Sequence, residues 1–137
     1  VLEVGLGRRL DATNVVEDPL VTVVTGIGMD HMDYLGPTLG DIAREKGGIF
    51  KPGRPVVLGP DIPDEARDAL LAVAREVGAQ APFEASADPL HPEGADLAAG
   101  TQTFRNMVSG ERYELPLLGA YQRANLATAL ATLDLLA

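Results

Sequence analysis

Runs of apolar residues along the first part of the chain predict strands that alternate with helices. Short, nearly continuous apolar runs occur at residues 1–4, 20–25 and 55–58, and glycines follow the first two. Such runs are typical of strands that are buried on both faces, as in a parallel sheet. Residues 38–48 and 61–78 instead carry apolar side chains at helical spacing. We therefore expect strands of a parallel sheet connected by helices.

Both predicted helices carry start and stop signals. Thr38 begins the first helix, with Asp41 as its capping-box partner, and a glycine pair ends it. Pro63 opens the second helix, and Gly78 ends it. The apolar stripe of the second helix consists of Ala66, Ala69, Leu70, Val73 and Val77.

The second half of the chain has a different pattern. Residues 85–100 are rich in Ala, Pro, Asp and Gly, and we expect them to form mostly loop. Residues 101–108 and 112–117 predict an antiparallel hairpin that turns around Ser109-Gly110. From Ala120 onward a final helix is predicted, with a stripe of Leu126, Ala129, Leu130 and Leu133. The predicted fold class is α/β, a mostly parallel sheet flanked by helices with an antiparallel hairpin.

Composition and charge narrow the class of protein. The chain has 137 residues, of which 46% are hydrophobic, enough for one domain with its own core. Its net charge of −9, without a basic cluster, argues against nucleic acid or an anionic membrane as partner. It contains no cysteine, which excludes disulfides, thiolate metal sites and cysteine nucleophiles.

The sequence shows no signal for membrane insertion or secretion, and its two ends resemble internal segments. No apolar run approaches the roughly 18 residues of a membrane-spanning helix, and no secretion signal opens the chain. We therefore expect a cytoplasmic protein. Val1 opens within a strand pattern and Ala137 closes within a helical pattern, so we expect a piece of a longer protein.

Two candidate metal ligands follow predicted strands. Glu3 ends the first strand, and His31 comes shortly after the second. Ligands of open α/β sheets bind at the carboxyl ends of the strands, where a carboxylate and an imidazole could hold a divalent cation. From pattern alone, a solvated glutamate and a surface histidine remain the alternative.

Lys46 is a second kind of candidate. It shares a helical face with Leu39, Ile42 and Ala43, so a cationic side chain lies on an apolar stripe. One interpretation is a lysine that favours the helix C-terminus and extends to water. The other is a partly desolvated lysine whose neutral amine can react.

Several familiar sites are missing from the sequence. The glycines near the start lack the third glycine of a dinucleotide fingerprint, and no Walker sequence is present. The remaining histidine, His91, lies between prolines, and we expect it at the surface.

Four segments resemble those of folylpolyglutamate synthases and dihydrofolate synthases. They are EVGLGRRLDATN at 3–14, TGIGMDH at 25–31 with Leu35-Gly36, REKGGIFKPG at 44–53, and GAYQRAN at 119–125. They occur in the family's order and span most of the chain. This family belongs to the Mur-ligase-like ATP-dependent amide ligases.

The resemblance implies an ATP-dependent acid–amino-acid ligase that adds L-glutamate to folates. The γ-carboxylate of the folate attacks the γ-phosphate of ATP to give an acyl phosphate, which the amine of glutamate then attacks. ATP and Mg²⁺ are the implied co-substrate and cofactor, and folate and glutamate are the implied partners. The acceptor is tetrahydrofolate polyglutamate, dihydropteroate or both, and the full-length protein is expected to be a monomer.

The resemblance also implies site residues. Glu3 and His31 match the residues that hold magnesium, and His31 thereby belongs to the catalytic centre. Lys46 matches a catalytic lysine that is carbamylated, while Asn125 and Gln122 lie on the adenine side of ATP. Two positions depart from the family's pattern: Arg8 stands where a second glycine is usual, and Tyr121 replaces the usual histidine.

The resemblance also suggests the domain organisation. Residues 1–137 are expected to be part of the central ATP-binding domain, without the upstream Walker loop and the downstream glutamate-ligase domain, and therefore inactive alone. Two alternatives remain: a muramyl peptide ligase of the same superfamily, and a non-catalytic remnant that binds nucleotide or folate.

Overall fold

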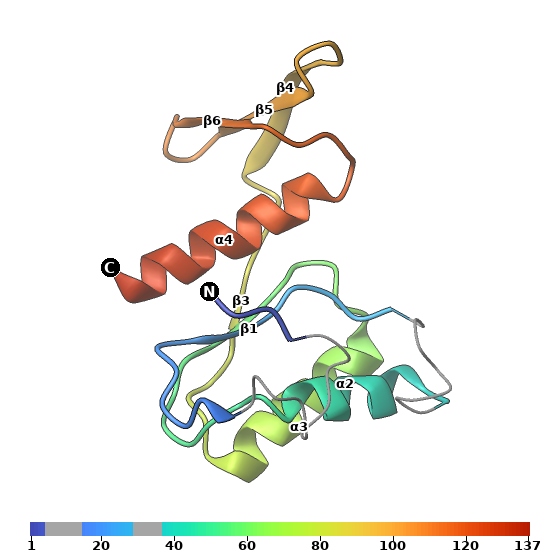
Figure 1. Cartoon of the computed structure of the whole chain (residues 1–137), viewed down its shortest axis with the longest axis vertical. Helices are drawn as coiled ribbons and strands as arrows, with labels where there is room; N and C mark the ends of the chain where they lie inside the picture. Colours follow the sequence, from blue (N-terminus) through green and yellow to red (C-terminus); the bar gives the residue numbers. More distant parts are fainter. Residues whose placement is uncertain (5–14, 29–36) are drawn as a thin grey trace.

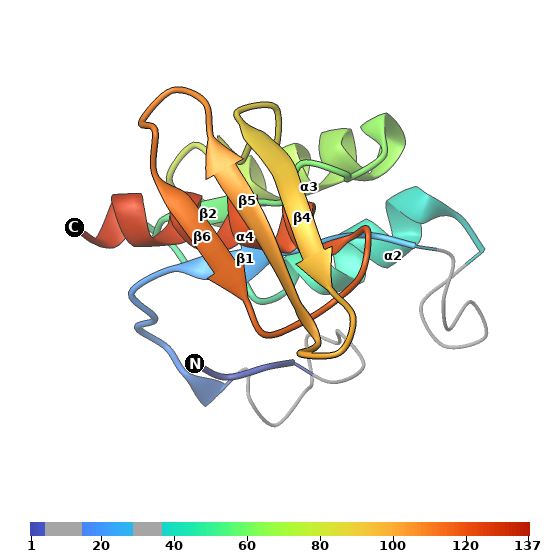
Figure 2. The same cartoon turned by 90° about the horizontal axis from the view of Figure 1, so that it is seen from above.

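A computed structural model describes residues 1–4, 15–28 and 37–137 (Figure 1). The elements form two small sheets and three helices among these residues, with α4 between the two sheets (Figures 1 and 2). In chain order they are β1 (Thr22–Val24), α2 (Leu39–Gly47), β2 (Val56–Leu58), α3 (Asp64–Val77), β3 (Phe83–Glu84), β4 (Leu90–Asp96), β5 (Thr101–Asn106), β6 (Arg112–Leu115) and α4 (Gln122–Leu136). None of the described helices is long and apolar enough to cross a membrane.

The first sheet is parallel and is covered on both faces. Its strand order is β1-β2-β3, with Val24 opposite Leu58 and Leu58 opposite Glu84. Val56 and Leu58 pack into the core formed with α2 and α3, whereas Val57 packs on the other side against Ala131 of α4. All three residues of β2 are buried, which explains why this strand is an unbroken apolar run.

The helices α2 and α3 begin and end where their sequence signals lie. The Thr38 hydroxyl accepts a hydrogen bond from the Asp41 backbone N–H at 3.0 Å, which caps α2. Gly78 ends α3 in the left-handed conformation with φ +70°, a backbone that favours glycine. Gly48 ends α2 with an ordinary right-handed backbone, so the stop there does not depend on positive φ.

The antiparallel part of the fold is larger than the predicted hairpin. The hairpin itself is confirmed, since β5 pairs with β6 and Phe104 lies opposite Tyr113. The prediction of mostly loop over residues 85–100 is wrong for residues 90–96, which form β4 and pair with β5. A bulge between Pro92 and Gly94 accommodates the two residues that disfavour regular strand.

The final helix is confirmed, but its predicted stripe is wrong in part. Ala129 and Leu133 are exposed, whereas α4 buries a set that faces two directions: Gln122, Ala124, Leu126, Ala127, Thr128 and Ala131. Leu126 packs against Leu90 and Phe104 of the antiparallel sheet, and Ala131 packs against the parallel sheet. A helix between two sheets buries more than one stripe, and the small residues let both sheets approach.

The first predicted strand is not observed. Residues 1–4 belong to no strand, and the side chains of Val1 and Leu2 are exposed. An apolar run becomes a strand only when a neighbouring strand supplies hydrogen bonds. The α/β fold class is confirmed, with a parallel sheet, flanking helices and an antiparallel unit.

Candidate functional site

The carboxyl ends of the parallel strands bring together the segments that carry candidate chemistry. Because β1, β2 and β3 run in the same direction, residues that follow them meet at one edge of the sheet. Gly26 lies two residues beyond β1 at this edge. The Nζ atom of Lys46 donates a hydrogen bond of 3.3 Å to the Gly26 carbonyl oxygen. The lysine amine therefore reaches the edge where ligands bind in folds of this kind.

The helix α2 holds Lys46 in this position. Ile42 and Ala43 are fully buried, and Leu39 packs against the same core. Lys46 continues this face in the last turn of α2 and is half-buried. The shared helical face is therefore confirmed. The amine donates its hydrogen bond to a backbone carbonyl at the sheet edge.

The structure describes only one of the two candidate metal ligands. Glu3 is exposed and lies in the segment of residues 1–4, whereas His31 falls within residues 29–36, outside the described part of the chain. Among the described residues, no group of three or more His, Cys, Asp or Glu side chains is arranged to hold a metal ion. The donor chemistry still fits a divalent cation, since carboxylate oxygen and imidazole nitrogen are both ligands for such ions.

The two candidate adenine-side residues lie together on the first turn of α4. The Nδ2 atom of Asn125 donates a hydrogen bond of 3.2 Å to the Oε1 atom of Gln122. Gln122 is buried, whereas Asn125 is exposed and can meet a ligand. A fixed glutamine thus orients an accessible asparagine amide.

Contacts that the sequence did not predict hold this end of α4. The Arg123 guanidinium donates two hydrogen bonds to the Ala87 carbonyl, from Nε at 3.0 Å and Nη2 at 2.7 Å. Gly119 has φ +137°, and the ring of Tyr121 lies so close that a Cβ atom there would be 3.1 Å from it. The residues of the Arg123 contact are separated by 36 positions, so no local pattern could reveal the partner.

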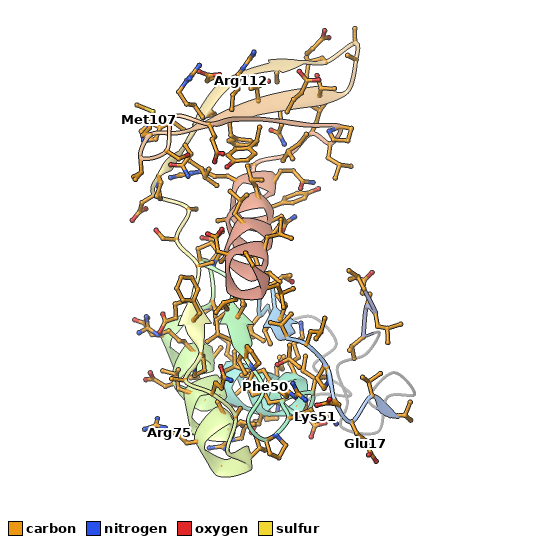
Figure 3. The ribbon with its side chains drawn as sticks, turned by 90° about the vertical axis from the view of Figure 1, so that its left-hand side faces the viewer. Glu17, Phe50, Lys51, Arg75, Met107 and Arg112 are labelled. Carbon is orange, nitrogen blue, oxygen red and sulfur yellow. The ribbon has the colours of Figure 1, made fainter. Side chains whose placement is uncertain are left out.

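The antiparallel sheet carries a separate charged cluster. The Glu93 carboxylate accepts hydrogen bonds from Arg105 Nε at 2.5 Å and from Arg112 Nε at 2.9 Å. The hydrogen bond from Arg105 is the main cause that lowers the pKa of the Glu93 carboxyl. Figure 3 shows Arg112 at the end of the molecule opposite Phe50 and Lys51, which follow α2. This cluster therefore lies away from the α2 side of the candidate site.

Comparison with known proteins identifies the family. The Mur ligase middle domain matches residues 1–133. The chain belongs to the Mur ligase middle-domain family. A folylpolyglutamate synthase of Arabidopsis thaliana is 40% identical over 133 residues, which cover 97% of this chain and 20% of that relative.

Two solved structures share the fold. One, described as an FPGS-AMPPCP-folate complex, is 34% identical with a TM-score of 0.77, covering 98% of this chain and 33% of that chain. The other is a bifunctional folylpolyglutamate synthase/dihydrofolate synthase with Mn, AMPPNP and L-glutamate bound; it is 38% identical with a TM-score of 0.59, covering 97% and 30%. This Mur ligase middle domain thus spans a third or less of the length of these relatives.

Proposed function

We propose that the full-length protein is an ATP-dependent ligase that adds L-glutamate to folates through an acyl-phosphate intermediate. The observation that carries the proposal is the position of Lys46, whose amine lies beside the Gly26 carbonyl at the carboxyl edge of the parallel sheet. The folylpolyglutamate synthase of Arabidopsis and the two solved structures, which hold folate, L-glutamate and ATP analogues, support the substrate classes.

On the adenine side we assign ATP binding to Asn125 and Gln122. Asparagine can pair with adenine, whose amino group donates a hydrogen bond and whose ring nitrogen accepts one. The exposed Asn125 has an Oδ1 acceptor and a second Nδ2 hydrogen in addition to the one directed at Gln122. Gln122 is buried and acts through Asn125, because it fixes the plane of that amide.

For the metal centre we assign Glu3 and His31 as ligands, with Mg²⁺ as the ion. A bound divalent cation offsets the negative charge of the phosphates during transfer. Lys46 is assigned as a carbamylated lysine: its neutral Nζ bonds to the carbon of CO₂ and loses a proton, so that an amine becomes a carboxylate. The half-buried side chain places this amine beside the Gly26 carbonyl, at the carboxyl edge of the parallel sheet.

We further propose that residues 1–137 are part of the central ATP-binding domain of the full-length enzyme. In this assignment a phosphate-binding loop and a glutamate-ligase domain lie elsewhere in that enzyme. Folate and L-glutamate are the substrates, and the enzyme works as a cytoplasmic monomer. The 137 residues alone are then expected to hold part of the site and to catalyse no ligation.

The test is a substrate-dependent assay on the full-length protein. ATP and glutamate are supplied with tetrahydrofolate, with dihydropteroate or with a muramyl nucleotide as acceptor, and the new amide product is measured by mass spectrometry. We expect product with at least one pteridine acceptor. Product with the muramyl nucleotide alone would contradict the folate assignment. Tight ATP binding without any product would indicate a non-catalytic binding protein.

A further inference from the structure

Gly59 lies where β1, β2 and α4 meet. Its backbone N–H donates a hydrogen bond of 2.8 Å to the Val24 carbonyl, directly after the last pair of the parallel ladder. A Cβ atom at this position would lie 2.1 Å from the carbonyl oxygen of Thr25 and 3.2 Å from the Oγ1 atom of Thr128. The first contact is with backbone, which cannot rotate away as a flexible side chain can.

The requirement for glycine here is one of space. Gly59 is absent from the glycines with positive φ, which include Gly53 and Gly78, so a left-handed backbone is not what requires glycine here. What excludes a side chain is the closeness of Thr25. By contrast, a Cβ atom on Gly94 of β4 would meet nothing within 4 Å.

On the β1 side, the close approach of Gly59 to Thr25 is linked through the backbone to Lys46. Thr25 is joined directly to Gly26, whose carbonyl oxygen accepts the hydrogen bond from Lys46 Nζ. A displacement of the Thr25 carbonyl therefore moves the peptide that holds the amine.

On the α4 side, the close approach of Gly59 to Thr128 is linked through the helix to the residues assigned to adenine binding. Thr128 is 3% exposed, and its hydroxyl donates a hydrogen bond of 2.9 Å to the Ala124 carbonyl, so its side chain is fixed on the helix. Thr128 lies one turn after Asn125 on the same rigid helix. A side chain at position 59 would therefore push against the element that carries Asn125.

We propose that Gly59 is a positioning residue that sets the spacing between Lys46 and the adenine-binding turn of α4. The inference rests on the proposed function, because Lys46 and the first turn of α4 both belong to the site proposed there. Transfer of a phosphoryl group requires the bound nucleotide and the catalytic groups to be correctly positioned relative to each other, and a misplacement of about 1 Å can lower the rate about a hundredfold. Gly59 maintains these positions because the two strand backbones and α4 meet there without an intervening side chain.

The test compares Gly59→Ala with Gly94→Ala in the full-length protein, well below the unfolding temperature of each. We expect Gly59→Ala to lower kcat about ten- to a hundredfold, to raise the KM for ATP, and to increase the stimulation by added bicarbonate, which promotes carbamate formation. Gly94→Ala should behave like the wild type. If Gly59→Ala lowers only the unfolding temperature and leaves kcat, KM and the bicarbonate response unchanged, the inference is overturned.

A second pair of variants changes the α4 side of the contact with Gly59, at Thr128. Thr128→Ile adds bulk toward Gly59, whereas Thr128→Ser keeps the hydroxyl and adds none. We expect Thr128→Ile to raise the KM for ATP several-fold relative to Thr128→Ser, with the bicarbonate response little changed. Equal KM values would overturn the inference even if Gly59→Ala does not fold. Absence of ligase activity in the wild type would overturn the proposed function itself, which is a different outcome from wild-type activity with unaffected variants.

Discussion

The side-chain amide of Asn125 donates a hydrogen bond to the side-chain oxygen of Gln122, one turn earlier on α4, with the donor and acceptor 3.2 Å apart. Gln122 is buried at 8% exposure, and Asn125 is exposed. One residue therefore fixes the orientation of the other, and the accessible amide is already oriented before a ligand arrives. Such preorganisation reduces the entropy lost on binding.

Replacement of Gln122 should therefore weaken ATP binding more than it slows chemistry. Gln122→Met keeps the length of the side chain but removes the acceptor for Asn125. A hydrogen bond of this kind contributes about 0.5–1.5 kcal/mol, so we expect the KM for ATP to rise about two- to tenfold with a smaller change in kcat. Steady-state kinetics of the full-length enzyme measure both, and Gln80→Met, at an exposed loop glutamine, is the control. Identical KM values for the two variants would contradict the role of Gln122.

Lys46 provides a test of the carbamate. Lys46→Ala should reduce ligase activity severely, and a short carboxylate such as formate or acetate should restore part of it. Lys46→Arg keeps the positive charge but forms no stable carbamate, so it should remain as inactive as Lys46→Ala without added carboxylate. Near-normal turnover of Lys46→Ala without added carboxylate would exclude the carbamate.

The two histidines of the chain allow a matched test of the metal site. His31→Ala should raise the Mg²⁺ concentration needed for half-maximal activity, because one ligand of the ion is lost. His91→Ala is the control, since His91 is exposed on β4. Activity of the wild type should disappear with a chelator and return with added Mg²⁺ or Mn²⁺. An unchanged Mg²⁺ requirement in His31→Ala would remove His31 from the metal site.

The sequence predicted those elements whose signals are local. The cap of α2 depends on Thr38 and Asp41, three residues apart, and the end of α3 depends on the left-handed conformation of Gly78. The stripe that places Lys46 beside Ile42 and Ala43 is equally local, so the sequence alone marks this lysine as a candidate.

The features that the sequence did not predict depend on distant partners. The strand β4 contains Pro92 and Gly94, and it forms because β5 pairs with it and Arg105 binds Glu93 across the two strands. The buried faces of α4 follow from its place between two sheets, which a single helical stripe cannot show. The requirement for glycine at position 59 arises from Thr25 in another strand, so only the folded chain reveals it.

The ion pairs that Glu93 forms with Arg105 and Arg112 lead to a prediction for the antiparallel sheet. The hydrogen bond from Arg105 lowers the pKa of the Glu93 carboxyl, so at acidic pH the unfolded chain binds a proton that the folded chain does not. The stabilisation is fully present above the unfolded pKa of about 4.3, and it is lost as pH falls through the lower folded value.

Glu93→Gln should therefore weaken this dependence on pH. Hydrogen-exchange protection of the β4 and β5 amides, corrected for the intrinsic exchange rate at each pH, measures the effect in the full-length protein. We expect wild-type protection to decrease from neutral pH toward pH 3 by more than that of Glu93→Gln. Glu114→Gln, at an exposed position of β6, should retain the wild-type dependence. An equal decrease in wild type and Glu93→Gln would show that the exposed cluster contributes nothing measurable, as is common for surface ion pairs.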